Sequence, residues 1–291
     1  MLEEKLKGAI LLFEDWHSKK YIGSSRIRGH WLIKNWDKVP PYNSTLESFV
    51  QGQKYDFVIF QKTYWLDFVK KFEGIKILDF CDVDWLDTVP VIEIIDNCDA
   101  VTTSTEALRD EIKKFTDKPV VCIPDRQDLE FHNLKKKHEG RAKMVVWFGY
   151  SHNSKVLDKT ILFLKKYNLK LKVISDNRPP YMKADKNVKY DWGNPGFDFN
   201  KEVLEGDMVL MPENTRARGR FKSNNKTLTA WCLGMPVATT PDELVKFLDP
   251  EERKKEAELR LKEVKEKWSV ELSVKDFKNL IEQLKNDKRR R

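Results

Sequence analysis

The segment from Met208 to Pro241 constrains the fold most strongly, because blocks of apolar and polar residues follow one another there at the lengths of strands and helices. An apolar run at 208–212 leads into a polar loop, then into a helical pattern, and then into a second apolar run after Gly234. Gly234 supplies a left-handed helix stop, and Pro236 prevents the helix from continuing. The segment therefore predicts a strand, loop, helix and strand in βαβ order.

The loop of this unit combines positive charge with residues that cap helices. Ser223, Asn224 and Asn225 are typical of helix N-termini, whose free N–H groups and positive dipole end attract anions. The loop and helix start therefore predict a phosphate or diphosphate site. Its candidate ligands are Arg218, Arg220, Lys222, Ser223, Asn224, Asn225 and Lys226.

The pattern Lys222-Ser223-x-Asn225-Lys226, then Ala230 and Gly234-x-Pro236-Val237, resembles the donor-binding segment of nucleotide-sugar glycosyltransferases with the two-Rossmann-domain (GT-B) fold. In the large retaining group of that fold, two glutamates with seven residues between them precede the same ending. Here the corresponding positions hold Phe221 and Thr229. The resemblance implies an α/β chain of two Rossmann-like domains facing a cleft, with a diphosphate site in the second and Thr229 near the donor.

Length and composition fit two globular domains. The chain has 291 residues, of which 40% are apolar and 34% charged, with a mean hydropathy of −0.61. Its longest apolar runs are of strand length, so we expect a cytoplasmic protein without a membrane segment. The four cysteines are scattered singly among apolar residues, which favours buried free thiols.

The order of predicted elements places the domain boundaries. Apolar strands at 8–13, 55–60, 75–80, 100–104 and 119–124 alternate with helical patterns, whereas residues 125–141 lack apolar periodicity and are typical of a linker. We predict an acceptor domain at 1–124, a donor domain at 142–248, and helices at 249–291 that pack back on the first domain, as GT-B chains usually end.

Candidate acceptor and catalytic residues follow the first strands. In GT-B enzymes the loop after the first strand faces the cleft, so the resemblance makes Asp15 and His17 candidate catalytic bases, either of which can accept a proton from an attacking hydroxyl. Asp82 and Asp84 follow another strand end, where they fit acceptor contacts, although a metal site is an alternative there. We assign the acceptor to Ser25, Arg26, Arg28, Asp82 and Asp84.

A glycine-led turn opens the second half after the strand at 144–148. This turn is similar to the first loop of GT-B donor domains, which approaches the nucleotide diphosphate. The candidate donor or sugar contacts are Gly149, Ser151, His152 and Asn153.

We therefore expect a glycosyltransferase, either a hexosyl- or a pentosyltransferase, that uses a nucleotide-diphosphate sugar such as a UDP-sugar. Cations around the leaving diphosphate make a metal unnecessary in this mechanism, and no cofactor is required. An epimerase of the same fold is one alternative. A dinucleotide-dependent dehydrogenase is disfavoured, because neither half carries Gly-x-Gly-x-x-Gly after its first strand.

The formal net charge of +8, with a pI near 9.1, favours an anionic partner. One candidate acceptor is DNA with hydroxymethylated pyrimidines, which small phage-type GT-B enzymes glycosylate. Arg26, Arg28 and the lysines at 135–137 would then contact phosphates. A glycan or small-molecule acceptor is the alternative, as is a non-catalytic basic nucleic-acid-binding protein, although the sequence has no zinc, helix-turn-helix or ribonucleoprotein signature.

Overall fold

The computed structural model describes residues 5–13, 23–86, 90–158, 160–176, 188–190, 198–212 and 217–290. These residues form two compact units, which the chain enters more than once. The first unit comprises Met1–Asp128, Arg216–Ser223 and Ser269–Arg291 in their described parts, and the second comprises Leu129–Thr215 and Asn224–Trp268. The chain therefore passes between the units after residues 128, 215, 223 and 268.

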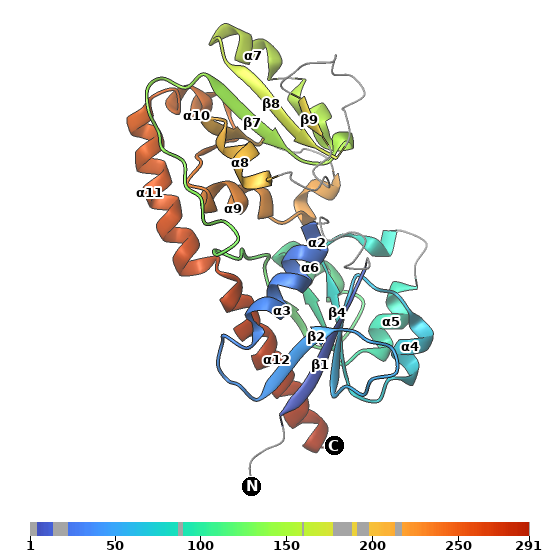
Figure 1. Cartoon of the computed structure of the whole chain (residues 1–291). Helices are drawn as coiled ribbons and strands as arrows, with labels where there is room; N and C mark the ends of the chain where they lie inside the picture. The colour runs from blue at the N-terminus through green and yellow to red at the C-terminus, as the bar shows by residue number, and fades with distance from the viewer. Residues whose placement is uncertain are drawn as a thin grey trace. The chain divides into compact units, whose positions relative to one another are not determined.

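The first unit is built on a six-stranded parallel sheet with the order β2-β1-β3-β4-β5-β6 (Figure 1). Its strands are β1 (Leu6–Leu12), β2 (Ser44–Ser48), β3 (Phe57–Gln61), β4 (Ile75–Phe80), β5 (Ala100–Thr103) and β6 (Val120–Cys122). Its helices are α2 (Gly23–Ser25), the π-helix η1 (Arg26–His30), α3 (Trp31–Trp36), α4 (Leu66–Lys71), the 3-10 helix η2 (Asp84–Leu86), α5 (Val91–Asn97), α6 (Glu106–Ile112), the 3-10 helix η4 (Ala217–Phe221) and α12 (Val270–Arg290).

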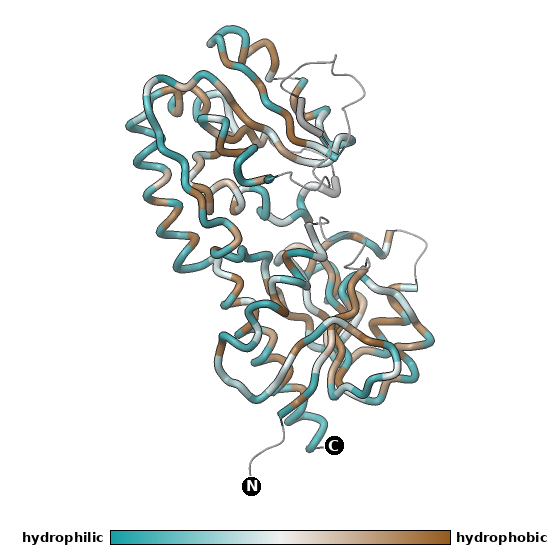
Figure 2. Tube along the Cα trace, in the orientation of Figure 1, coloured by the Kyte–Doolittle hydropathy of each residue, from teal (hydrophilic) through white to brown (hydrophobic). Residues whose placement is uncertain are grey.

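Strand β3 shows why this sheet is buried on both faces. Phe57 and Ile59 pack in one apolar cluster with α3 and α12, while Val58 and Phe60 pack in another with α4 and α5. Successive side chains of a strand point to opposite faces, so a continuous apolar run is what a sheet covered by helices on both sides requires. The tube coloured by hydropathy shows these apolar strands inside more polar helices (Figure 2).

The second unit has a five-stranded parallel sheet with the order β11-β10-β7-β8-β9. Its strands are β7 (Met144–Phe148), β8 (Lys170–Ser175), β9 (Val188–Tyr190), β10 (Met208–Leu210) and β11 (Val237–Ala238). Its helices are the 3-10 helix η3 (Ser151–Leu157), α7 (Ile161–Lys166), α8 (Phe199–Leu204), α9 (Asn225–Cys232), α10 (Pro241–Lys246) and α11 (Pro250–Lys267). The predicted α/β fold with two parallel sheets is confirmed.

The predicted βαβ unit forms strand β10, helix α9 and strand β11. The helix ends as expected, because Gly234 adopts φ +68° directly after it. A capping box then starts α10: the Thr240 hydroxyl accepts from the Glu243 N–H, and the Glu243 side chain accepts from the Thr240 N–H. These local signals fix where α9 ends and where α10 begins.

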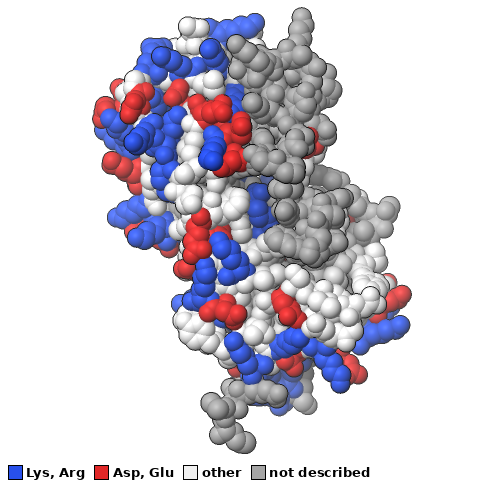
Figure 3. All heavy atoms as spheres, in the orientation of Figure 1, with Lys and Arg blue, Asp and Glu red and all other residues white. Residues whose placement is uncertain are grey.

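The helical C-terminal region consists of two helices that belong to different units. Helix α11 lies in the second unit, and only α12 lies in the first, where Val274, Phe277 and Ile281 fill its core. Acidic and basic side chains are interspersed on the face shown in Figure 3. On α11 they form ion pairs such as Lys254–Glu251 and Arg260–Glu256, both at 2.7 Å, so this part of the basic charge is locally balanced.

Candidate functional site

The second unit has a topological switch point between β7 and β10. From β7 the chain adds β8 and β9 on one side, and it then returns to add β10 and β11 on the other side. Ligands of open α/β sheets bind outside the carboxyl ends of strands at such a point. The loop after β7 leads into η3, and the segment after β10 leads into α9. Both therefore start at the expected ligand position.

Gly149 and Lys226 bring these two segments together. Gly149 follows β7, Lys226 is the second residue of α9, and a Cβ added to Gly149 would lie 2.6 Å from the Lys226 Nζ. The same ammonium lies 5.4 Å from the centre of the Trp147 ring. The ammonium, the glycine backbone and the start of an eight-residue helix are thus gathered at the switch point.

The predicted contacts in the β7 loop lie on η3 and its start. The backbone N–H of Ser151 donates to Asp176 Oδ1 at 2.7 Å, which fixes the loop to the end of β8. The exposed ring of His152 stacks on Tyr150 with centroids 5.7 Å apart, and the Asn153 amide nitrogen lies 3.0 Å from His152 Nε2. The structure therefore brings Ser151, His152 and Asn153 together beside Gly149.

At the start of α9, Asn224 is the N-cap but its side chain makes no capping hydrogen bond, and Asn225 is the first helical residue. Thr229, predicted to contact the donor, is only 5% exposed, and its hydroxyl donates to the Asn225 carbonyl at 2.9 Å. This back-bond directs the hydroxyl toward its own helix. Asn224, Asn225 and Lys226 therefore suit an anion better than Thr229 does.

The basic loop that precedes α9 is divided between the units. Residues 217–223 belong to the first unit, whereas α9 belongs to the second. Within the first unit, Lys222 forms an ion pair with Asp82, and the Ser223 hydroxyl donates to Asp125 Oδ2 at 2.5 Å. The Arg220 guanidinium lies 4.5 Å from the centre of the Phe221 ring. The side chain of Arg218 lies outside the described residues.

The first unit has its own switch point between β1 and β3, since β2 lies on the other side of β1. Asp15 and His17, which follow β1, lie outside the described residues. Lys62 and Thr63 follow β3, and the Thr63 hydroxyl donates to the Leu11 carbonyl at 3.2 Å. Polar residues of the described chain thus reach the carboxyl end of this sheet as well.

Asp82 and Asp84 face lysine and tyrosine side chains. Asp82 pairs with Lys62 at 2.7 Å, and Asp84 accepts from the Tyr64 hydroxyl at 2.5 Å and lies 3.6 Å from Lys62. Burial alone would raise the pKa of Asp82, but Lys62 and Lys222 outweigh it and lower that pKa. Among the described residues, no group of three or more His, Cys, Asp or Glu side chains is placed to hold a metal ion.

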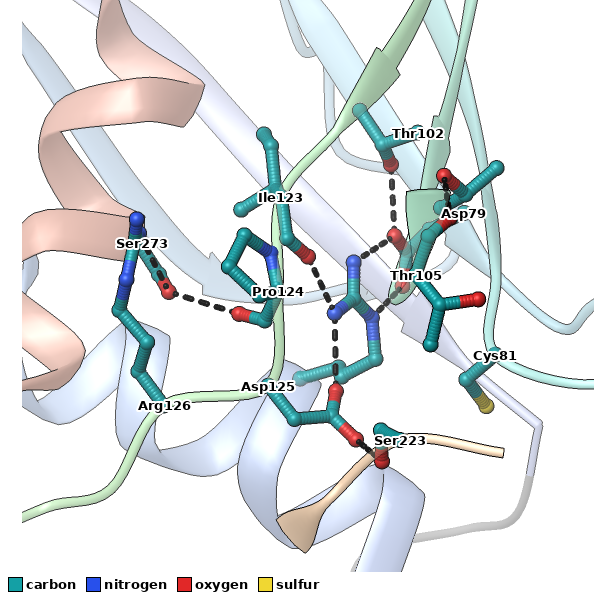
Figure 4. Close-up of polar contacts among 12 residues, drawn as sticks. Asp79, Cys81, Thr102, Thr105, Ile123, Pro124, Asp125, Arg126, Ser223 and Ser273 are labelled. Atoms are coloured by element: carbon teal, nitrogen blue, oxygen red, sulfur yellow. Dashed lines mark hydrogen bonds and ion pairs between the residues drawn. The ribbon is translucent and has the colours of Figure 1, made fainter. Parts of the chain in front are cut away.

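Arg28, predicted to contact the acceptor, is instead buried in an ion-pair network, whose partners Asp79, Ile123 and Asp125 are labelled in Figure 4. Its guanidinium donates to Asp79 at 2.5 and 2.7 Å, to Asp125 at 2.9 Å and to the Ile123 carbonyl at 2.8 Å. Its side chain is 3% exposed, so it joins the ends of β4 and β6 to η1 and does not reach a bound molecule. Ser25 is also buried, whereas Arg26 is half-buried against Trp31.

The linker lysines are also engaged within the second unit. Lys135 donates to the His132 carbonyl at 2.5 Å, and Lys136 donates to the Leu204 carbonyl at 2.9 Å. His132 itself is buried, with Nδ1 2.9 Å from Asn200 Oδ1. Two of the three lysines expected to contact DNA phosphates therefore fix the linker in place.

Sequence reasoning missed Asp79 and Asp125 as partners of Arg28. Asp79 lies in the predicted strand at 75–80, and Asp125 is the first residue of the predicted linker. They are 51 and 97 residues away from Arg28 in the sequence, so no local pattern indicates the pairing. The only available indication was a charged residue at the end of an apolar strand, which is typical of a sheet edge that carries polar function.

Comparisons with known proteins identify the fold. No family model matches the sequence, and no curated protein is similar to it in sequence. Among solved structures, the chain is similar to TarM, with a TM-score of 0.59 and 14% identity over 86% of this chain and 57% of TarM, so it spans little more than half of that protein.

Two further structures match nearly end to end. The lipopolysaccharide outer core galactosyltransferase WaaB in its apo form has a TM-score of 0.58 and 11% identity, over 96% of this chain and 99% of WaaB. AviGT4, a glycosyltransferase involved in avilamycin A biosynthesis, has a TM-score of 0.52 and 12% identity, over 96% of this chain and 98% of AviGT4. The chain therefore has the GT-B fold of nucleotide-sugar glycosyltransferases, as the sequence predicted. No helix within the described residues is both long and apolar enough to cross a bilayer.

Proposed function

We propose that the protein is a glycosyltransferase that transfers a sugar from a nucleotide-diphosphate donor to a hydroxyl group. The observation that carries this proposal is the approach of Lys226 to Gly149 at the switch point of the second unit. A glycine lets an anion approach the backbone closely, and the ammonium and the N-terminus of α9 supply positive charge. The GT-B fold is the setting in which such a site holds a donor diphosphate.

In this mechanism the second unit binds the diphosphate through Lys226 and the backbone N–H groups at the start of α9. Charge grows on the diphosphate oxygens as the bond to the sugar breaks, and preorganised cationic and N–H donors stabilise that charge. Loss of one such donor typically lowers the rate by on the order of 10²-fold. No metal ion is needed when lysine and helix N–H groups perform this role.

The base that activates the acceptor is assigned to the loop after β1, where Asp15 and His17 follow the strand beside the switch point of the first unit. A carboxylate or imidazole there accepts the proton of the attacking hydroxyl. Asp15→Asn and His17→Ala are expected to separate donor binding from sugar transfer. Replacement of the residue that acts as the base should lower the rate of transfer and leave the affinity for the nucleotide diphosphate unchanged.

The acceptor itself is a separate question from the donor. The burial of Arg28 and the internal hydrogen bonds of Lys135 and Lys136 remove three of the cations assigned to DNA phosphates. A glycan or small-molecule acceptor is consequently the better proposal, and DNA with hydroxymethylated pyrimidines becomes an arm of the test. Incubation with a panel of nucleotide sugars and each acceptor class, followed by mass spectrometry, detects the added sugar.

Donor binding is tested by calorimetry with uridine 5′-diphosphate and other nucleoside diphosphates. Lys226→Met is expected to weaken binding of the preferred nucleotide by about tenfold or more, since a charge-assisted contact contributes about 1.5–3 kcal/mol. Lys201→Met is the matched control, because Lys201 lies on α8 of the same unit with an exposed side chain paired with Asp198. Equal affinity of Lys226→Met and the wild type would exclude this donor site.

A further inference from the structure

The segment that precedes α9 is docked on the first unit by three consecutive residues. Phe221 is buried among Val83 and Leu108, and its ring lies edge-to-face with Trp85 at 5.9 Å. Lys222 pairs with Asp82, and the Ser223 hydroxyl donates to Asp125. Lys222 and Ser223, which the sequence assigns to a diphosphate, are therefore each bound to a carboxylate of the first unit.

Asp82 is shared unequally between two lysines. Lys62 is 13% exposed and also lies near Asp84, so it is enclosed by two carboxylates. The Lys222 side chain, by contrast, is 59% exposed. An anion from solution therefore reaches Lys222 more easily than Lys62, and Asp82 would keep Lys62 as a partner after losing Lys222. The exchange removes one partly exposed ion pair, and such pairs contribute little to stability.

We propose that Asp82 is a built-in competitor of the phosphate ligand at Lys222. In the unliganded protein the Asp82 carboxylate neutralises this lysine and holds residues 217–223 on the first unit. A phosphate group that binds Lys222 displaces Asp82 and loosens this attachment. The inference rests on the proposed function, because it takes the competing phosphate group from a nucleotide-diphosphate donor.

The experiment measures affinity for inorganic pyrophosphate and for uridine 5′-diphosphate by calorimetry in four variants. Asp82→Asn is expected to bind both several-fold more tightly than the wild type, and Lys222→Ala is expected to bind both more weakly. In the double variant the gain from Asp82→Asn should disappear, since the competitor acts only through Lys222. Asp110→Asn is the charge control, because Asp110 is exposed in the same unit and pairs with Arg109.

The outcomes separate this inference from the function on which it rests. Weaker binding by Lys222→Ala combined with unchanged or weaker binding by Asp82→Asn overturns the competitor role alone. Equal binding by Lys222→Ala and the wild type shows that Lys222 does not bind the phosphate group and overturns the competitor role, whereas the donor site at Lys226 is tested separately by Lys226→Met. An equal gain in Asp110→Asn assigns the effect to net charge and also overturns the competitor role.

A second measurement on the wild type covers the case in which Asp82→Asn does not fold. Hydrogen exchange of the 217–223 backbone is followed with and without saturating pyrophosphate. Displacement of Asp82 predicts faster exchange in this segment on addition of pyrophosphate, including at the Lys222 N–H, which donates to the Gly219 carbonyl at 3.1 Å. Unchanged or slower exchange with ligand bound contradicts the proposal.

Discussion

Arg28 and Asp79 form a two-point ion pair in the interior of the first unit, with the Nε and one terminal nitrogen of the guanidinium donating to the two carboxylate oxygens at 2.7 and 2.5 Å. The Thr102 hydroxyl donates to the same carboxylate at 2.6 Å, and the other terminal nitrogen of the guanidinium donates to Asp125. Every partner comes from a different strand end or helix, so this pair holds together the edge of the sheet where the acceptor is expected.

Replacement of Arg28 by Met should destabilise the protein strongly, because Asp79 and Asp125 would remain buried without their cation. The loss of one partner of a buried ion pair costs about 3–5 kcal/mol. Urea denaturation measures the change in the free energy of unfolding. Arg109→Met is the control, since Arg109 pairs with exposed carboxylates and its loss should change stability far less than the loss of Arg28. Comparable effects of the two substitutions would contradict a structural role for the Arg28 network.

Stability should fall as the pH is lowered from 7 toward 4, partly through His30. Burial, together with the nearby charge of Arg26, lowers the pKa of His30 from 6.5 to about 4. The unfolded chain therefore binds a proton at this residue between these two values and the folded chain does not, so acid favours unfolding in that window. The full effect below pH 4 is about 3 kcal/mol.

His30→Gln should consequently reduce the slope of stability against pH between 4.5 and 6.5, measured by urea denaturation at several pH values. The lowered pKa of Asp82 acts in the same direction, but its effect lies below the ordinary carboxylate pKa of 3.8 and outside this window. An identical slope in the variant and the wild type would show that the pKa of His30 is the same in the folded and unfolded states.

Gly149→Ala should weaken binding of the nucleotide diphosphate and also lower stability. The added methyl would lie 2.6 Å from the flexible Lys226 Nζ, which it would displace from the switch point, and 2.9 Å from the ring of the buried Trp147. Calorimetry measures the affinity and thermal unfolding the stability. Gly206→Ala is the control for lost packing, because its methyl would lie 2.3 Å from a methyl of the buried Val146, so stability should fall there without a change in affinity. A Gly149→Ala protein with unchanged affinity would exclude a ligand at this position.

Sugar transfer should persist in the presence of a chelator such as EDTA, because lysine and helix N–H groups neutralise the leaving diphosphate in the proposed mechanism. The measurement compares nucleotide diphosphate release with EDTA, and with manganese added back after EDTA treatment. Activity that is lost with EDTA and restored by manganese would refute metal independence and direct attention to Asp82 and Asp84, which would then have to exchange Lys62 and Lys222 for the ion.

Local signals in the sequence were sufficient for most elements of the fold. The apolar run at 57–60 lies in strand β3, whose residues are all buried because helices cover both faces of the sheet, and Gly234 ends α9 with the predicted left-handed backbone. Strand β2 was not predicted, since its sequence Ser-Thr-Leu-Glu-Ser is mostly polar and it lies at the edge of the sheet. The glycine-led turn after β7 leads into η3 and then α7, not into a single continuous helix.

The candidate site was predicted less completely because its partners are distant in sequence. The glycine-led turn after β7 and the start of α9 were found from their residue types, and they meet at Gly149 and Lys226. Nothing in the local pattern of residues 217–223 distinguishes a loop that projects into solvent from one that docks on the first unit. That outcome depends on Asp82 and Asp125, which lie 140 and 98 residues away from their partners.

The four passages of the chain between the two units limit how the protein can be dissected. An expression fragment that stops in the linker lacks α12, whose side chains complete the apolar core of the first sheet, and it also lacks the docked segment at 217–223. A fragment that begins after the linker carries both of these pieces without the sheet that buries them. Chimeras that exchange donor specificity with another GT-B protein therefore need breakpoints near residues 128, 215, 223 and 268, because a single junction would combine incompatible cores.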